Sequence, residues 1–350
     1  MHPQLYEVFS WSQRRMKAIG YQLDADGKAG GFVELEQQTP KPEGHDLLVK
    51  IEAISVNPVD CKVRQSIVDA HNPPRILGWD AAGIVESAGE KVSLFKPGER
   101  VFYAGDITRS GSYASHQLVD EHIVGRMPES LDFAAAAALP LTSITAWESL
   151  FDRLKIDPEA DRGKQLLIIG GAGGVGSIAI QLAKQVANLH VTATASREES
   201  RQWCFSLGAD EVINHHEDIA AQFEQRSLSA PEYILCLNSS DFYFEAMTEL
   251  IAPQGVICSI VGTSQKHDLD RLKSKSAGFV WEFMFTRSMY KTADMIRQHE
   301  LLNSIAELVD SGTIKTTLNQ TWGRMTAENI MAAHHQLETG SSIGKIVLTN

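Results

Sequence analysis

The glycine-rich segment 170–176, with the sequence GGAGGVG, constrains the fold more than any other feature of this chain. It follows directly on the strand-like run QLLII and leads into a segment whose apolar residues recur at helical spacing. A strand, a glycine turn and an amphipathic helix in succession are typical of a unit that holds a dinucleotide pyrophosphate at the helix N-terminus. The apolar residues of the helix are Val175, Ile178, Ala179, Leu182, Ala183 and Val186.

Each glycine has an expected physical role. Gly171 is predicted to make the tight turn, Gly173 to let the backbone approach the pyrophosphate, and Gly176 to let helix and strand pack closely. Gly174 and Val175 complete the predicted cradle, because the first helical N–H groups and the helix dipole attract an anion.

The end of the next predicted strand indicates which dinucleotide is bound. NAD-binding chains carry Asp or Glu there to bind the ribose hydroxyls. This chain has Ser196 and Arg197, and its first carboxylate is Glu198. Ser196 can donate a hydrogen bond to a 2′-phosphate and Arg197 can pair with it, which favours NADPH. The alternative is that Arg197 is solvated at a helix start and that either cofactor binds through other contacts.

The pattern of elements predicts an α/β plus β chain with two domains. Residues 1–15 are interpreted as an N-terminal extension, and 16–138 as a β-rich domain of short strands broken by turns. Residues 139–288 alternate strands with helices, as in βαβ units on a parallel sheet. Residues 289–350 begin with a helix and end in a strand, IGKIVLTN, that is predicted to return to the first domain.

The composition of the chain argues against nucleic acid and membranes as binding partners. With 350 residues and a formal net charge of −12, the chain repels nucleic acid and anionic membranes. No apolar run approaches the 18 or so residues that span a bilayer, so we expect a cytoplasmic protein. The four cysteines are far apart, which fits buried, reduced thiols rather than a disulfide framework.

Ordered motifs along residues 16–350 resemble the medium-chain dehydrogenase/reductase superfamily, in particular its quinone oxidoreductase branch and the zinc-type alcohol dehydrogenase-like proteins. The resemblance implies a GroES-like β-barrel catalytic domain and a Rossmann-fold nucleotide-binding domain, with the nicotinamide in the cleft between them. The motifs are Asn57-Pro58-Val59-Asp60, GWDAAGIV (78–85), KPGERV (96–101), GSYA (111–114), LPLTSITAW (139–147), the glycine loop and LGAD (207–210).

The chain departs from the zinc-using members of this family. Where they carry Gly-His-Glu, it has Gly78, Trp79 and Asp80, and Asn57 stands at the position of their first cysteine ligand. Zinc prefers three His, Cys or carboxylate ligands, so we predict no catalytic zinc. An unconventional site that uses Cys61 and His71 stays open, although a packed thiol and a solvated imidazole are the simpler interpretations.

A site without zinc favours acceptors that delocalise incoming charge, such as quinones and α,β-unsaturated carbonyls. The resemblance implies that Asn57 and Asp60 face the nicotinamide and substrate. Asn57 is then a candidate to hydrogen-bond a developing oxyanion, while Asp60 either takes part or holds its loop. Trp79 and Tyr103 are interpreted as walls of the substrate pocket or, alternatively, as core residues.

The resemblance also implies that Thr145 approaches the nicotinamide, that Val261 and Gly262 meet its carboxamide, and that Asn238 and Lys345 contact the cofactor. The apolar segment 280–287 is typical of an interface or a substrate cleft, and we expect a homodimer. Two other functions remain: a zinc-dependent alcohol dehydrogenase, and an NADPH-binding protein with little turnover.

Overall fold

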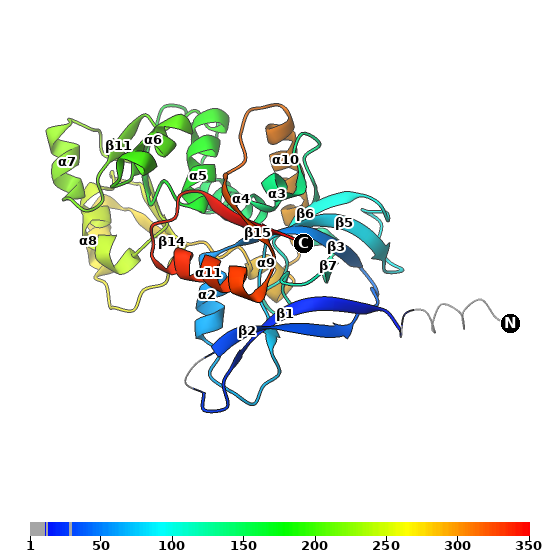
Figure 1. The fold of residues 1–350 in the computed structure, drawn as a ribbon. Coiled ribbons are helices and arrows are strands. Elements are labelled where there is room, and N and C mark those ends of the chain that lie inside the picture. The colour runs from blue at the N-terminus through cyan, green and yellow to red at the C-terminus, as the bar shows by residue number, and fades with distance from the viewer. Residues whose placement is uncertain (1–10, 12, 28–29) are drawn as a thin grey trace. The chain divides into compact units, whose positions relative to one another are not determined.

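The computed structural model describes residues 11, 13–27 and 30–350, which divide into two compact units (Figure 1). Unit 1 comprises the described part of Met1–Leu141 together with Phe285–Asn350, and unit 2 comprises Thr142–Met284. The extension expected at residues 1–15 lies mostly outside the described residues, and strand β1 (Arg15–Leu23) begins at its last residue.

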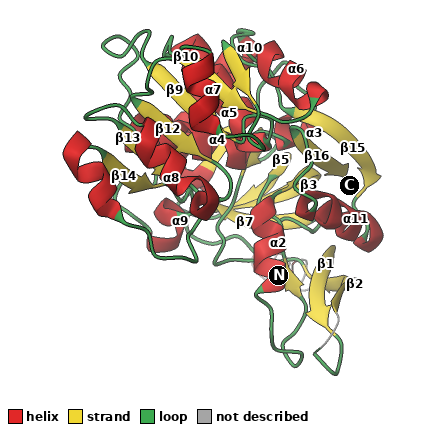
Figure 2. Ribbon diagram, turned by 90° about the vertical axis from the view of Figure 1, so that its left-hand side faces the viewer, coloured by secondary structure: helices red, strands yellow, loops and turns green. Residues whose placement is uncertain are grey.

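Unit 2 is built on a parallel sheet with strand order β11-β10-β9-β12-β13-β14. Every pairing in this sheet is parallel, and this order is that of the Rossmann fold predicted from the sequence. The strands are β9 (Gln165–Ile169), β10 (His190–Thr194), β11 (Glu211–Ile213), β12 (Tyr233–Cys236), β13 (Val256–Ser259) and β14 (Gly278–Trp281). The crossover helices are α5 (Gly174–Gln181), α6 (Glu198–Ser206), α7 (Ile219–Gln225) and α8 (Ser240–Leu250), which Figure 2 shows beside the strands.

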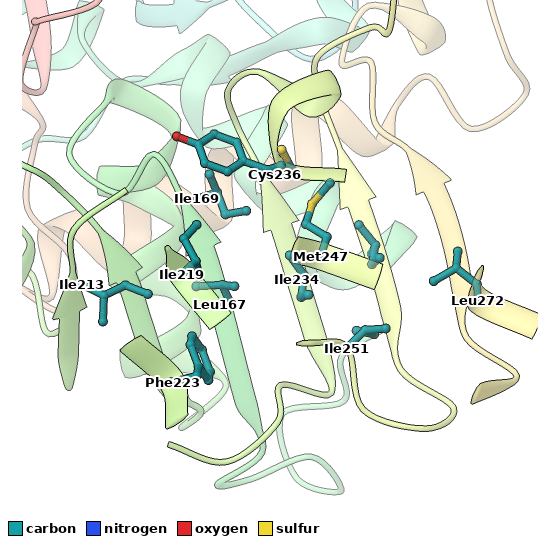
Figure 3. Packing of buried hydrophobic residues seen from close by; sticks show 12 residues of the cluster. Leu167, Ile169, Ile213, Ile219, Phe223, Ile234, Cys236, Met247, Ile251 and Leu272 are labelled. Atoms are coloured by element: carbon teal, nitrogen blue, oxygen red, sulfur yellow. The ribbon is translucent and has the colours of Figure 1, made fainter. Parts of the chain in front are cut away.

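The strands of unit 2 are almost wholly apolar because helices cover both faces of a parallel sheet. Figure 3 shows one of these cores, in which side chains of β9, β12 and β13 meet those of α7 and α8. On α5 and the helical turn that follows it, the predicted apolar face is buried at Ile178, Ala179, Leu182 and Ala183. These four positions are buried as predicted, but Ser177, Ile180 and Gln181 are buried as well, so the burial of α5 extends beyond the predicted face.

Strand β14 is not among the strands predicted from the sequence. Its residues GFVW pair on one side only, with β13, and a short edge strand carries little alternation of apolar and polar residues. Helix α10 (Arg297–Asp310) is likewise shorter than the predicted helical stretch, which began near Ala293.

Unit 1 contains two sheets. The smaller has the order β2-β1-β4 and the larger the order β15-β16-β3-β5-β6-β8, with β7 also pairing with β3. Strand β16 pairs antiparallel with β3, so the end of the chain lies beside a strand from its first sixth, as Figure 1 shows. The strands are β2 (Gly30–Gln38), β3 (Asp46–Val56), β4 (Arg75–Ile76), β5 (Ala81–Ala88), β6 (Arg100–Tyr103), β7 (His116–Asp120), β8 (Val124–Arg126), β15 (Leu318–Arg324) and β16 (Lys345–Thr349).

The remaining helices connect these strands: α2 (Pro58–Gln65), α3 (Phe133–Ala137), α4 (Pro140–Trp147), α9 (Thr286–Tyr290) and α11 (Ala327–Glu338). All four cysteines are buried and none forms a disulfide. Among the described residues, no helix is both long and apolar enough to cross a bilayer.

Candidate functional site

The turn after β9 is held by the neighbouring strand. Gly170 has φ +92°, which favours glycine. Its N–H donates to Oγ1 of Thr194 at 3.0 Å, and the N–H of Gly171 donates to the Thr194 carbonyl at 3.1 Å. The N–H of Gly173 lies 3.4 Å from the Gly170 carbonyl oxygen, so Gly171 lies inside the turn and the left-handed backbone falls one residue earlier, at Gly170.

Close packing explains why Gly171 and Gly176 carry no side chain. A Cβ on Gly171 would lie 2.8 Å from Cβ of Ala193, and one on Gly176 would lie 2.4 Å from the carbonyl oxygen of Gly170. A Cβ on Gly173 would meet only that same oxygen, at 3.7 Å. Space is thus left open at Gly173, where α5 begins and where the first helical N–H groups, those of Gly174 and Val175, have no intrahelical acceptor. This arrangement fits an anionic diphosphate.

The other cofactor candidates of unit 2 follow the ends of neighbouring strands. Ser196 and Arg197 follow β10, Asn238 follows β12, and Val261 and Gly262 follow β13. Because these strands are parallel, their carboxyl ends meet at one edge of the sheet, which is where such folds bind ligands.

The contacts at this edge agree with that arrangement. A Cβ built on Gly170 would lie 3.8 Å from Cβ of Asn238, so the glycine turn and the end of β12 are neighbours. Thr145 also belongs to unit 2, where it is buried on α4.

Basic groups gather where β10 and β11 end. Arg197 is exposed at the N-cap of α6, with its N–H donating to Oγ of Ser200, and Ser196 is half-buried. Burial lowers the pKa of His215, and the positive charges of His216 and Arg197 lower it further. Between the end of β10 and Glu198 the chain carries no carboxylate. The segment with Ser196 and Arg197 therefore suits an additional anionic group on a bound nucleotide.

Helix α8 fixes the loop that carries Val261 and Gly262. Ser240 donates through Oγ to the Val261 carbonyl at 2.7 Å. Asp241 accepts from the N–H of Ser264 at 2.8 Å, and its Oδ1 lies 2.6 Å from Nε2 of His267. Sequence reasoning missed these two residues, because a Ser-Asp pair at a helix start is ordinarily a local cap.

In unit 1, three of the polar residues highlighted by the sequence meet in the core. Nζ of Lys345 donates to the Val56 carbonyl at 3.0 Å, to Oδ2 of Asp80 at 3.1 Å and to Oδ1 of Asn57. Nδ2 of Asn57 donates to Oδ2 of Asp80 at 2.8 Å. All three side chains are almost completely buried. We call Asn57, Asp80 and Lys345 the lysine cluster.

The lysine cluster does not fit a catalytic zinc ion. Lys345 supplies a positive charge to Asp80 and Asn57, and the other oxygen of Asp80 accepts from the N–H of Leu141 at 2.8 Å. Among the described residues, the single group with metal-ligand geometry contains none of these side chains. The three donors of Lys345 are also occupied, so its geometry favours a positioning role over the predicted contact with the cofactor.

Asp60 lies beside the lysine cluster and holds the start of α2. Its Oδ2 accepts from the N–H of Asn57 and from the hydroxyl of Tyr113, both at 2.9 Å. Burial raises the pKa of Asp60 to about 7, against the effect of those hydrogen bonds. Nε2 of His334 lies 2.9 Å from the same tyrosine oxygen, and burial lowers the pKa of His334 to about 3. When Asp60 is charged, Tyr113 donates to it and neutral His334 donates to Tyr113. Tyr113 and His334 were not among the predicted site residues, because both lie far from Asp60 in sequence.

The two aromatic candidates are completely buried. Trp79 donates through Nε1 to the Asp106 carbonyl at 3.2 Å and packs edge-on against Phe285, which favours the core alternative. Tyr103 lies on β6 opposite Ala81. Its hydroxyl has no hydrogen-bond partner among the described residues, and burial raises its pKa.

Two family models match the chain. The model described as "Alcohol dehydrogenase GroES-like domain" matches residues 43–129, and the one described as "Zinc-binding dehydrogenase" matches residues 207–348. A zinc-type alcohol dehydrogenase-like protein of Staphylococcus aureus is 46% identical over 336 residues, which cover 95% of this chain and 99% of that protein.

Solved structures of alcohol dehydrogenase-like proteins and quinone oxidoreductases are also similar to this chain. A protein of Rhizobium etli, provisionally named a zinc-dependent alcohol dehydrogenase, has a TM-score of 0.90 at 46% identity over 96% of this chain and 98% of its own. The quinone oxidoreductase of Escherichia coli, solved with NADPH, has a TM-score of 0.79 at 25% identity over 95% of this chain and 100% of its own. These relatives share the GroES-like and Rossmann units, while their names divide between zinc chemistry and quinone reduction.

Proposed function

The chain belongs to the medium-chain dehydrogenase/reductase superfamily, quinone oxidoreductase branch, and from that premise we propose that it is an NADPH-dependent reductase of quinones or α,β-unsaturated carbonyls that works without catalytic zinc. That it is an oxidoreductase follows from its relatives; the cofactor preference and the acceptor class are the proposal.

The observation that carries the proposal is the lysine cluster. In zinc-using relatives the position of Asn57 supplies a metal ligand, the acid that corresponds to Asp80 lies close to the metal, and the metal stabilises an alkoxide. Here the buried charge of Asp80 is balanced by Lys345 at 3.1 Å. Without a Lewis acid, the favoured acceptors are those whose own conjugation spreads the incoming negative charge.

A nicotinamide cofactor, when bound, supplies the hydride. The residues of this chain bind and orient it: Gly173, Gly174 and Val175 offer backbone N–H groups to its diphosphate, and Arg197 offers a charge to a 2′-phosphate. Ser240 and Asp241 keep the loop of Val261 and Gly262 in a fixed conformation. The chain's contribution is therefore mainly positioning.

Paired titrations with NADPH and NADH test the cofactor part, followed by an acceptor screen with quinones and enones. We expect tighter binding of NADPH and turnover with conjugated acceptors that survives treatment with a chelator. Tighter binding of NADH would contradict the interpretation of Ser196 and Arg197. Oxidation of simple alcohols that is lost with chelator would favour the zinc-dependent alcohol dehydrogenase. Binding of NADPH without turnover would favour the other alternative, an NADPH-binding protein with little turnover.

We also propose that the active form is a homodimer. The edge strand β14 and the segment after it carry two exposed aromatic side chains, Trp281 and Phe283, which are 48% and 45% exposed. Exposed apolar groups at a sheet edge are typical of an interface. Light scattering on the purified protein measures the assembly state, and a monomer at micromolar concentration would contradict the proposal.

A further inference from the structure

We propose that His45, Glu121 and His122 form a binding site for a divalent transition-metal ion, with Zn²⁺ as the best-matched ion. These residues lie before β3 and after β7. The lysine cluster lies beyond the opposite end of β3, whose 11 residues span about 35 Å. The proposed site is therefore distinct from the position of the catalytic metal in zinc-using relatives.

Strand register brings the first two ligands together. Strands β3 and β7 pair antiparallel with Asp46 opposite Asp120. The next pair outward is His45 and Glu121, and the N–H of Glu121 donates to the His45 carbonyl at 2.9 Å. Nδ1 of His45 lies 2.7 Å from Oε1 of Glu121. Two potential ligands 76 residues apart in sequence are thus held as direct neighbours.

Glu121 is oriented for a ligand role by its own hydrogen bonds. Its side chain is fully buried, and Oε2 accepts from the N–H groups of Ser93 and Leu94 at 2.9 and 2.7 Å. Its other oxygen, Oε1, is thereby left directed at His45.

His122 is oriented by Asp120. Oδ1 of Asp120 accepts from the backbone N–H of His122 at 2.9 Å and lies 2.7 Å from its Nδ1. A carboxylate that holds one imidazole nitrogen is the usual support of a metal-binding histidine, and it leaves Nε2 available. The rings of His45 and His122 have centroids 4.8 Å apart.

The ligand set matches a particular class of ion. One ligand atom from each of the three residues lies within 4.8 Å of the others, and two imidazoles with one carboxylate suit Zn²⁺ with a water at an open position. Ligands of one zinc ion are at most about 4.2 Å apart, since each bond is about 2.1 Å, so only a small adjustment of the side chains is needed, and His45 can provide it. It is free to do so because its side chain is 43% exposed.

The neighbourhood also favours a cation. Asp120 lines a pocket in unit 1 together with the carboxylates of Glu43, Asp46 and Asp106 and the cations Arg109 and Lys291. Arg109 already pairs with both oxygens of Asp46 at 2.8 Å. Carboxylates therefore outnumber cations beside the proposed ligands, which favours the approach of a metal ion.

Zinc titration of chelator-treated, full-length protein tests the proposal, with bound metal followed by competition against a chromophoric chelator. We expect one Zn²⁺ per chain at micromolar concentration, and at least tenfold weaker binding in each of the variants His45→Gln and His122→Gln. His335→Gln, which removes an exposed imidazole on α11 in unit 1, is the matched control and leaves binding unchanged. Both ligand variants lie on the surface, so they avoid the folding risk of replacing buried Glu121.

Two results would overturn the proposal. One is the lack of saturable binding up to about 100 μM Zn²⁺, and the other is tight binding that persists in a double variant of His45 and His122. Reductase activity is expected to be the same in that double variant and in the unsubstituted protein, with or without chelator. Zinc bound to the unsubstituted protein can lie at the proposed site, so its amount does not test for a catalytic metal. The double variant lacks the proposed site, so zinc bound to it would indicate a second, catalytic position.

Discussion

Nζ of Lys345 and Oδ2 of Asp80 lie 3.1 Å apart in the core of unit 1, where the lysine side chain is 4% exposed and the aspartate is fully buried. The two residues are 265 positions apart and meet because β16, which begins with Lys345, and β5, which follows Asp80, both pair with β3. Burial raises the pKa of Asp80, and the positive charge of Lys345 opposes that effect. The ion pair lies beside Asn57, which stands at the position of the first cysteine ligand in zinc-using relatives.

Removal of one member of this pair should destabilise the protein. Lys345→Met leaves the Asp80 carboxylate buried without its cation, and we expect a loss of about 3–5 kcal/mol in the free energy of unfolding. Adding Asp80→Asn should restore more than half of the loss, because no charge is then left unpaired. Urea denaturation of the single and double variants measures this, and equal stabilities of the two would show that the pair is not coupled.

Alanine substitutions in the glycine turn should affect protein stability and cofactor binding differently, depending on the position. Gly173→Ala adds a methyl group with space around it, so we expect unchanged thermal stability and at least tenfold weaker binding of NADPH. Gly176→Ala places its Cβ 2.4 Å from the Gly170 carbonyl oxygen, so we expect losses of both stability and binding. Differential scanning fluorimetry and cofactor titration distinguish the two, and Gly31→Ala, in open space in unit 1, is the control.

Arg197→Gln should reduce discrimination between the two cofactors. Removal of a charge-assisted contact to the 2′-phosphate is expected to weaken NADPH binding about tenfold, with the affinity for NADH unchanged. Fluorescence titrations with both cofactors give the ratio. An equal loss for NADH would mean that Arg197 acts on the shared part of the nucleotide or on the start of α6.

Stability should fall as the pH rises toward 9 because of a buried carboxyl group in unit 2. Burial and the neighbouring Glu148 raise the pKa of Glu282 from 4.5 to about 9, although Arg153 opposes them. Between these two pKa values the folded protein holds a proton that the unfolded chain has released. Each increase in pH then favours unfolding, by up to about 1.4 kcal/mol per pH unit.

Glu282→Gln removes this ionisation, so its free energy of unfolding should vary less between pH 6 and pH 9 than that of the unsubstituted protein. Denaturation curves at several pH values provide the measurement. Glu245→Gln, at an exposed glutamate on α8, should keep the original pH dependence. If the free energy of unfolding depended on pH in the same way in all three proteins, the raised pKa of Glu282 would be contradicted.

The sequence by itself determined the fold class and the strand–glycine turn–helix unit that we propose binds the cofactor. Both depend on local patterns: the helical spacing from Val175 to Val186 and a glycine turn between a strand and a helix. These patterns persist in the fold because a parallel sheet and its helices are built from consecutive segments. The turn that begins at Gly170 contains Gly171, as the local pattern predicts.

Only the tertiary structure decided how the buried polar groups are paired. Sequence separation hides that Lys345 meets Asn57 and Asp80, that His334 meets Tyr113, and that His45 meets Glu121, since each pair depends on strand pairing or helix packing between distant segments. Trp79 is a further example. The sequence shows that tryptophan stands where zinc-using relatives have a metal ligand, but it does not show that this side chain is completely buried. An unpaired charge in a low-dielectric core is strongly destabilising, so each buried charged group needs an oppositely charged or hydrogen-bonding partner. The register of the strands determines which group lies close enough to be that partner.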